Sequence, residues 1–242
     1  MNNAKIIAVT EPIIAAEDDA TPIFDESGYQ IGIADAMHVA LTVDEFIAYV
    51  ARVSNPSNQN NTLTAPKLLK YLAKHKHWSP FEMVNVVMEI ETTRDIARQI
   101  LRHRSFSFQE FSQRYADPTQ DLGFVTREAR LQDMKNRQNS IEVDDEFLQG
   151  TWEQLQNNLT TSVQKTYAWA IQNGIAKEQA RAVLPEGLTV SRMYMNGTLR
   201  SWIHYCQLRM GPETQKEHRE IARDCWYQIT EHFPSLKDAL DL

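Results

Sequence analysis

The chain has 242 residues, of which 42% are hydrophobic and 24% are charged, and its formal net charge is −7. This composition excludes a mainly disordered chain, and the acidic balance disfavours a protein that covers a long nucleic acid. The two cysteines, Cys206 and Cys225, are too few for a disulfide framework or a four-thiolate zinc site. Because no apolar run approaches about 18 residues and no signal-peptide pattern is evident, we expect a soluble, cytoplasmic protein without a membrane partner.

Hydrophobic periodicity predicts strands and helices along the whole chain. Strands are expected at 5–9, 81–93 and 189–195. Helices are expected to begin near Val43 and at Pro66, and to span about 94–101, 152–170, 176–184, 198–209 and 213–232. The first strand is apolar and β-branched, which is typical of a buried strand, and the second is long enough to be central in a sheet.

Local signals predict where several of these elements end. Thr42 followed three residues later by Glu45 is typical of a capping box, so a helix should start between them. Gly174 favours a helix end just before it, and Pro185 should halt the following helix. The Asn-Gly pair at 196–197 predicts a turn after the last strand.

Two segments interrupt the regular pattern. Residues 17–36 are rich in Asp, Pro and Gly, which predicts a loop or small hairpin inserted at the surface. Residues 117–150 are highly charged and predict an irregular excursion that contains one short strand. We find no repeat of fixed period and no linker, so we expect a single α+β domain over 1–242 that carries these two surface insertions.

The densest group of polar residues lies between 102 and 115, with arginines, serines, one histidine and one carboxylate. An ordinary explanation is a solvated helix end followed by an edge strand. The phenylalanines in the same stretch indicate partial burial instead, and a buried arginine needs an anionic partner. Ser112 and Arg114 alternate, so an extended segment would place a hydroxyl beside a guanidinium, as paired donors for a phosphate or a planar imide.

Other polar residues give weaker signals. His75 and His77 form an H-x-H pair that could ligate a metal, although a polar turn that contacts a ligand explains them as well. Arg181 and Arg209 each lie near the end of an apolar-faced helix, where a cation also complements the helix dipole. Ser112 has no histidine and carboxylate at a spacing that indicates an activated nucleophile, so we expect it to bind substrate.

The segment 102–115 resembles the signature of the flavin-dependent thymidylate synthases, whose pattern is R-H-R-x-x-S-x-N-E-x-S-x-R-Y. The matching residues are Arg102, His103, Arg104, Ser107, Glu110, Ser112, Arg114 and Tyr115. Gln109 stands where the family has Asn, which lengthens that amide by one methylene. Segments similar to further family motifs follow in the family's order at 51–54, 77–82, 180–185 and 208–209, so the resemblance covers about 40–232.

This resemblance implies an α+β fold with a mostly antiparallel sheet packed against several helices. It also implies a methyltransferase that converts dUMP to dTMP, with methylene-tetrahydrofolate as the carbon donor and NADPH as the reductant through bound FAD. Because the flavin would carry the hydride chemistry, Cys206 and Cys225 are expected to be packing residues. The family further implies a homotetramer with active sites where subunits meet, and no resident metal.

The resemblance also assigns roles to individual residues. Arg209 is expected beside the uracil imide, as the catalytic residue that stabilises negative charge on the ring. The implied dUMP-binding residues are Gln99, Arg102, Glu110, Ser112, Arg114, Arg181 and Arg209. The implied FAD-binding residues are Ser54, His77, Ser79, Arg102, His103, Arg104, Glu110, Arg200 and His204. If the chain is aligned one helical turn away, Asn196 would be the relevant amide.

Two other function classes stay open from the residues themselves. A metal-dependent nucleotide phosphohydrolase would use His75, His77 and His103 as metal ligands. A nucleic-acid-binding module would use the arginines between 102 and 114, with the phenylalanines as stacking platforms for bases.

Overall fold

A computed structural model describes residues 3–14, 22–33 and 40–240 of the chain. The chain divides into two compact units, which we name unit 1 and unit 2. Unit 1 comprises 1–7, 87–197 and 201–228, and unit 2 comprises 8–86, 198–200 and 229–242.

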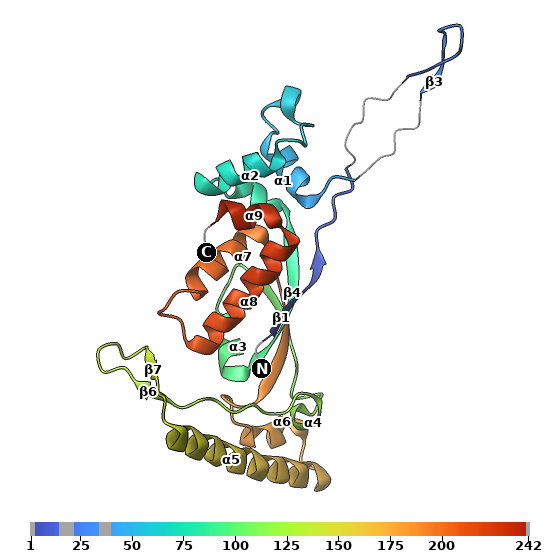
Figure 1. Cartoon of the computed structure of the whole chain (residues 1–242). Coiled ribbons are helices and arrows are strands. Elements are labelled where there is room, and N and C mark those ends of the chain that lie inside the picture. The colour runs from blue at the N-terminus through green and yellow to red at the C-terminus, as the bar shows by residue number, and fades with distance from the viewer. Residues whose placement is uncertain (1–2, 15–21, 34–39, 241–242) are drawn as a thin grey trace. The chain divides into compact units, whose positions relative to one another are not determined.

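Unit 1 is built on a four-stranded sheet whose strands come from distant parts of the chain. The strands are β1 (Asn3–Val9), β4 (Asn85–Thr93), β5 (Ser107–Glu110) and β8 (Val190–Thr198), in the order β1-β4-β8-β5. β5 runs antiparallel to β8, with Glu110 opposite Met193. Along one side of the sheet lie the helices α3 (Arg94–Ile100), α7 (Leu199–Arg209) and α8 (Lys216–His232) (Figure 1).

The core of unit 1 lies between this sheet and these helices. Side chains of β4 and β8 are buried in near alternation, as expected for strands that have one covered face. Trp202 and Tyr205 of α7 and His218 of α8 are buried as well. Cys206 and Cys225 have no exposed surface, which confirms the prediction that both are packing residues.

β1 lies at an edge of the sheet. The backbone N of Ala4 donates a hydrogen bond of 2.6 Å to Oδ2 of Asp224 on α8, which ties the strand to that helix. Ala4 is the one residue of β1 that is buried. The prediction of a buried strand at 5–9 is therefore wrong in its burial, because an edge strand has a neighbouring strand on one side only.

β4 begins at Asn85 rather than at 81, where the strand is predicted to start. Residues Ser79–Met83 form a 3-10 helix, η2, with Pro80 in its first turn. Proline suits such a position because its φ is fixed and its missing N–H would have no partner there. Phe81 is fully buried, so its apolar side chain marks the packing of η2 and not strand alternation.

β8 continues through 196–197 to Thr198, where the Asn-Gly pair predicts a turn. Gly197 is required for a different reason, since a Cβ on it would lie 2.4 Å from Cδ1 of Phe106. The ring of Phe106 packs edge-on against Trp202, with ring centroids 4.8 Å apart. The turn prediction is thus wrong, because the close approach of an aromatic ring to the strand explains the glycine.

The segment 117–150 is more regular than predicted. It contains the helix α4 (Pro118–Asp121) and a hairpin of β6 (Arg130–Gln132) and β7 (Ser140–Glu142). Asp145 accepts a hydrogen bond from the backbone N of Leu148, so α5 (Glu146–Gln172) begins at 146 and not at 152. The prediction of a single short strand is wrong, because two strands pair across the hairpin.

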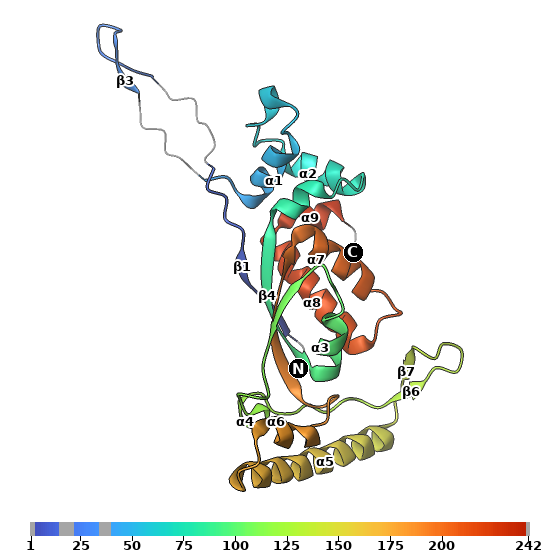
Figure 2. The same cartoon turned by 180° about the vertical axis from the view of Figure 1, so that it is seen from behind.

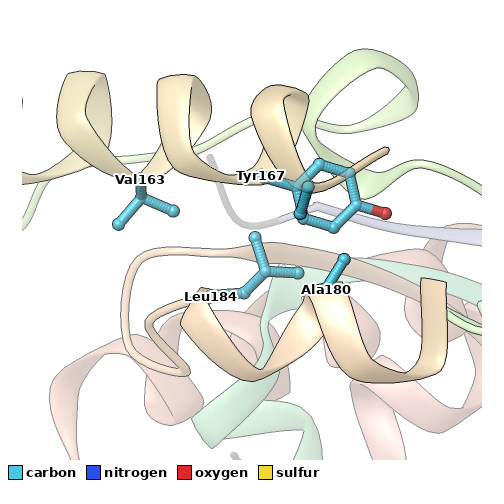
Figure 3. Packing of buried hydrophobic residues seen from close by; sticks show 5 residues of the cluster. Val163, Tyr167, Ala180 and Leu184 are labelled. Atoms are coloured by element: carbon cyan, nitrogen blue, oxygen red, sulfur yellow. The ribbon is translucent and has the colours of Figure 1, made fainter. Parts of the chain in front are cut away.

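α5 packs against α6 (Lys177–Ala180) and the 3-10 helix η3 (Arg181–Val183) in unit 1. The buried members of this small core are Val163, Tyr167, Ala170, Ala180 and Leu184 (Figure 3). Gly174, with φ at +78°, follows the end of α5 as predicted. The helix predicted at 176–184 is present as α6 followed by η3, and it ends before Pro185.

Unit 2 contains the helices α1 (Val43–Ala51), α2 (Ala65–Lys74) and α9 (Pro234–Ala239) and the 3-10 helix η1 (Pro56–Asn58). The predicted capping box is present, because Thr42 Oγ1 accepts from the N of Glu45 and the N of Thr42 donates to Oε2 of Glu45. α2 packs against both α1 and α9. The sequence pattern does not predict α9, since Pro234 marks the end of the preceding helix as well as the start of this one.

Unit 2 also includes a hairpin of β2 (Pro22–Phe24) and β3 (Gln30–Ile33). Asp25 Oδ1 accepts hydrogen bonds from the backbone N of Ser27 and of Tyr29, which closes the turn. This confirms the small hairpin predicted within 17–36. Residues 17–21 and 34–36 of that segment lie outside the described residues.

The observed elements confirm the predicted α+β class, with an antiparallel sheet packed against several helices. In the part of the chain that the structure describes, no helix is long and apolar enough to cross a membrane. The extent of a single domain over 1–242, with its surface insertions, stays a prediction.

Candidate active site

Half of the predicted site residues lie where the chain leaves α3, passes α7 and returns as β5, as Figure 2 shows in green. They are Gln99 on α3, then Arg102, His103 and Arg104 in the turn, Glu110 at the end of β5, and Ser112 and Arg114 just beyond it. All of them belong to unit 1.

Arg209, the last residue of α7, meets this segment at His103. Its Nε donates a hydrogen bond of 2.9 Å to Nε2 of His103, although 106 positions separate the two residues. The ring of Tyr205 lies edge-on to the His103 ring, with centroids 4.9 Å apart. The hydrogen bond fixes Nε of Arg209, and the guanidinium carries further donors on its two terminal nitrogens.

The His103 imidazole is neutral near pH 7. Burial and the neighbouring charge of Arg209 lower its pKa from 6.5 to about 4. A neutral ring that accepts a hydrogen bond at Nε2 carries its proton on Nδ1. The Arg209 guanidinium keeps its charge, because a guanidinium is not deprotonated in proteins. The pair therefore presents one positive charge in one fixed orientation.

A hydrogen-bond chain in the same unit links α7, α8 and α3. Tyr205 Oη lies 3.1 Å from Nε2 of His218, and Nδ1 of His218 lies 3.3 Å from Oε1 of Gln99. Nε2 of Gln99 donates to Oε1 of Gln215 at 2.8 Å. The sequence motifs identify only Gln99 among these residues. A histidine on the apolar stripe of a helix, as His218 is before Ile221, is the signal that could have found the chain.

Glu110 is mostly buried and surrounded by donors. Its Oε1 accepts a hydrogen bond of 2.9 Å from the hydroxyl of Ser191 on β8. The guanidinium groups of Arg94 and Arg98 lie 3.5 and 3.7 Å from its carboxylate. The charge of Glu110 is thus held in place by two arginines that the matched motifs do not include.

Arg114 and Arg181 come together at Glu178 of α6. Nη2 of Arg114 lies 3.3 Å from Oε2 of Glu178, and Nε of Arg181 donates to the backbone O of Glu178 at 3.3 Å. The hydroxyl oxygen of Ser112 accepts from the backbone N of Arg114 at 3.4 Å. Both guanidinium groups thus contact Glu178, and two guanidinium groups with a serine hydroxyl are donors that suit a phosphate.

The guanidinium groups of Arg102 and Arg104 are exposed. Neither forms an ion pair with a carboxylate among residues 3–14, 22–33 and 40–240. Two arginines without an internal anion are chemically suited to an external one.

The remaining predicted flavin-binding residues lie at several places. His204 is exposed on α7 in unit 1. Unit 2 carries Ser54, His77, Ser79 and Arg200. Arg200 forms an ion pair with Glu82 of η2, and the ring of His77 lies edge-on to Tyr71 with centroids 6.2 Å apart.

The histidines proposed as metal ligands are divided between the two units. No three His, Cys, Asp or Glu side chains converge as a metal site would within the described ranges. The rings of His75 and His77 in unit 2 are 6.2 Å apart, and His103 belongs to unit 1. The described structure thus gives no support to the phosphohydrolase ligand set.

Neither cysteine is placed to attack a substrate. Cys206 on α7 and Cys225 on α8 are fully buried, and burial raises the pKa of each thiol above its usual range. A protonated, inaccessible thiol is a poor nucleophile, so the chemistry must come from another group.

Comparison with known proteins finds relatives over nearly the whole chain. Residues 38–235 match the family described as "Thymidylate synthase complementing protein". The "Probable flavin-dependent thymidylate synthase" of Paramecium bursaria Chlorella virus 1 is 44% identical over 239 residues, which cover 99% of each chain. The "Flavin-dependent thymidylate synthase" of Synechocystis sp. is 49% identical over 201 residues, 83% of this chain and 91% of the relative.

A solved structure is similar in fold. The UMP/dUMP methylase PolB from Streptomyces cacaoi, bound with 5-Br dUMP, superposes with a TM-score of 0.72 at 20% sequence identity. The superposition covers 99% of this chain and 94% of that chain, so the whole α+β architecture is shared.

Proposed function

This chain belongs to the flavin-dependent thymidylate synthases, enzymes that convert dUMP to dTMP, and we propose which of its residues carry that reaction. The nucleotide binds in unit 1, along the segment from Gln99 to Arg114 and against Arg209. The observation that supports this proposal most is the hydrogen bond between Arg209 and His103. It brings the motif at 102–115 into contact with the motif at 208–209 within unit 1.

Arg209 is the catalytic residue in this proposal. Its terminal nitrogens donate to the imide of the uracil ring and stabilise negative charge there. A deprotonated imide makes the ring electron-rich and thus more reactive toward the incoming one-carbon unit. A guanidinium remains charged at working pH, so it stabilises the anion and does not take the proton itself. Neutral His103 positions the guanidinium by accepting from its Nε.

Ser112, Arg114 and Arg181 bind the phosphate of dUMP. A serine hydroxyl and two guanidinium groups supply several charge-assisted hydrogen bonds, which suit a dianion. The carboxylate of Glu178 lies in part of this place, since it pairs with Arg114. The phosphate replaces that carboxylate when dUMP binds. Gln99, Arg102 and Glu110 complete the nucleotide-binding set.

The residues present also fit FAD. The exposed guanidinium groups of Arg102 and Arg104 suit its pyrophosphate, with His103 and Glu110 nearby in sequence. By resemblance, Ser54, His77, Ser79, Arg200 and His204 add further contacts. When bound, the flavin supplies hydride transfer, whereas the chain supplies binding, orientation and electrostatics.

We propose methylene-tetrahydrofolate as the carbon donor, NADPH as the reductant and the cytoplasm as the location. We also propose a homotetramer whose active sites lie where subunits meet. Large apolar side chains on α5 are exposed, with Phe147 at 83% and Trp169 at 59%, and such groups are typical of an interface between copies.

The test is a reaction of the purified chain with FAD, NADPH, methylene-tetrahydrofolate and dUMP. We expect NADPH oxidation and dTMP formation that both require FAD, and dTMP formation that requires dUMP. A colourless protein that gains no flavin absorbance with added FAD and forms no dTMP would overturn the assignment. Metal content of about one ion per chain together with phosphate release would favour a phosphohydrolase instead.

A further inference from the structure

The hydrogen bonds of the chain that passes through Gln99 all run in one direction, which the carboxylate of Glu217 at one end determines. Glu217 is a carboxylate that pairs with Arg130, so it only accepts hydrogen bonds. Nε2 of Gln215 donates to Oε2 of Glu217 at 2.9 Å, which leaves Oε1 of Gln215 to face Gln99. Gln99 must then donate its Nε2 to Gln215 and turn its carbonyl oxygen toward His218.

The same logic fixes the proton of His218. Because Oε1 of Gln99 accepts, the proton of the neutral ring lies on Nδ1, and Nε2 accepts from the hydroxyl of Tyr205. His218 has no exposed surface, so no water replaces either partner. Burial and the nearby Arg209 lower its pKa to about 3, which keeps the ring neutral through the physiological range.

We propose that His218 is a positioning residue for the nucleotide: its Nδ1 proton locks the Gln99 amide in the one orientation that meets dUMP. A 180° flip of that amide would set its NH2 group against the Nδ1 proton of His218. The flip would also set its carbonyl oxygen against that of Gln215. The inference rests on the proposed role of Gln99 in binding dUMP, and it adds a residue that the matched motifs do not contain.

The lock has a chemical consequence for the ligand. One N–H of the Gln99 amide and one lone pair of its oxygen are used inside the protein, so one donor and one acceptor remain, both at fixed positions. A side chain fixed in this way loses little conformational entropy when the nucleotide binds. Gln99 thus presents a defined donor and acceptor pair to a pyrimidine nucleotide.

The experiment measures the dissociation constant and KM for dUMP of the FAD-loaded enzyme, together with kcat at saturating dUMP. His218→Phe fills the same space without either nitrogen, and we expect it to raise both constants about tenfold with kcat changed less than about twofold. His218→Asn places an amide nitrogen near the Nδ1 position and should restore binding to within about threefold. His232→Phe, at the exposed end of the same helix, is the control and should change nothing.

A double-mutant cycle separates positioning from general support of the fold. His218→Phe in a Gln99→Ala background should weaken dUMP binding no further, since the group that His218 positions is absent. Additive losses of dUMP binding in the double mutant would overturn the proposal. So would dUMP binding by His218→Phe that equals that of the wild type, or binding by His218→Asn that is as weak as binding by His218→Phe. If His218→Phe does not fold, Tyr205→Phe decides: a KM raised about threefold supports the lock and an unchanged KM contradicts it.

The outcome for the wild type separates this proposal from the proposed function. If the wild-type enzyme does not bind dUMP, the proposed function is ruled out, regardless of the results for the His218 variants. If the wild-type enzyme binds and methylates dUMP and His218→Phe binds dUMP equally well, only the positioning role of His218 is ruled out.

Discussion

Arg114 and Glu178 form an ion pair of 3.3 Å in which both side chains are about half exposed, at 54% and 50%. Exposed pairs of this kind contribute at most about 1 kcal/mol, so a ligand with a stronger anion can replace the carboxylate. The pair therefore holds Arg114 near Arg181 without blocking the site that we assign to the nucleotide phosphate.

Glu178→Gln should strengthen dUMP binding about threefold, because the variant removes the carboxylate that competes with the phosphate. Binding of deoxyuridine, which lacks the phosphate, should stay unchanged. Titration calorimetry with both ligands measures the effect. Glu153→Gln on α5 provides a surface control of the same charge change. Weaker dUMP binding by Glu178→Gln would contradict this use of Arg114.

Gly197→Ala should destabilise unit 1 by roughly 1–3 kcal/mol, because the new methyl group meets the ring of Phe106. Gly187→Ala is the matched control, since a Cβ there has no atom within 4 Å, and its effect should stay within about 0.5 kcal/mol. Urea unfolding measures both. Equal effects of the two substitutions would show that the ring does not approach the strand as described.

The free energy of unfolding should fall as the pH falls from about 6.5 toward 4. In the folded state the pKa of His103 is lowered to about 4 and that of His218 to about 3, whereas the unfolded value is 6.5. The unfolded chain therefore binds more protons in this window, and the stability present above pH 6.5 is lost on acidification. Chemical unfolding at a series of pH values tests this, and His103→Gln should make the decline shallower.

Cys206→Ala and Cys225→Ala should each leave the rate of dTMP formation per bound flavin within about twofold of wild type. Each should lower the free energy of unfolding by roughly 1 kcal/mol, because it leaves a small cavity in the core. The rate and an unfolding curve are measured on the same preparation. A variant that keeps its fold and flavin but loses turnover would restore a thiolate mechanism.

Local signals in the sequence predict local structure well. The capping box at Thr42 and Glu45 and the helix end before Gly174 depend on residues within one helical turn, and both are present as predicted. Gly197 shows the limit, because this glycine is required by the ring of Phe106, which lies just before β5 and far away in sequence, and no short-range pattern contains that contact. The start of α5 at 146 could not be predicted from the hydrophobic pattern either, because exposed apolar residues such as Phe147 and Trp152 obscure the helical periodicity.

In the candidate site, too, some residues can be identified from the sequence, whereas their contacts cannot. Motif residues such as His103 and Arg209 could be named from the sequence, because their residue types and spacing are distinctive. Their mutual hydrogen bond could not, since it depends on how α7 packs beside the turn after α3. His218 and Glu178 contact partners that are far away in sequence, so these two residues can be identified only from the folded structure.

The most direct measurement is dTMP formation per bound flavin by Arg209→Ala and Arg209→Lys under saturating substrates. We expect Arg209→Ala to lose at least about 100-fold in rate while FAD stays bound, because the charge that stabilises the pyrimidine anion is gone. Arg209→Lys keeps the charge without the planar fork and should lie in between. An Arg209→Ala enzyme that binds FAD and methylates dUMP at nearly the wild-type rate would contradict the account.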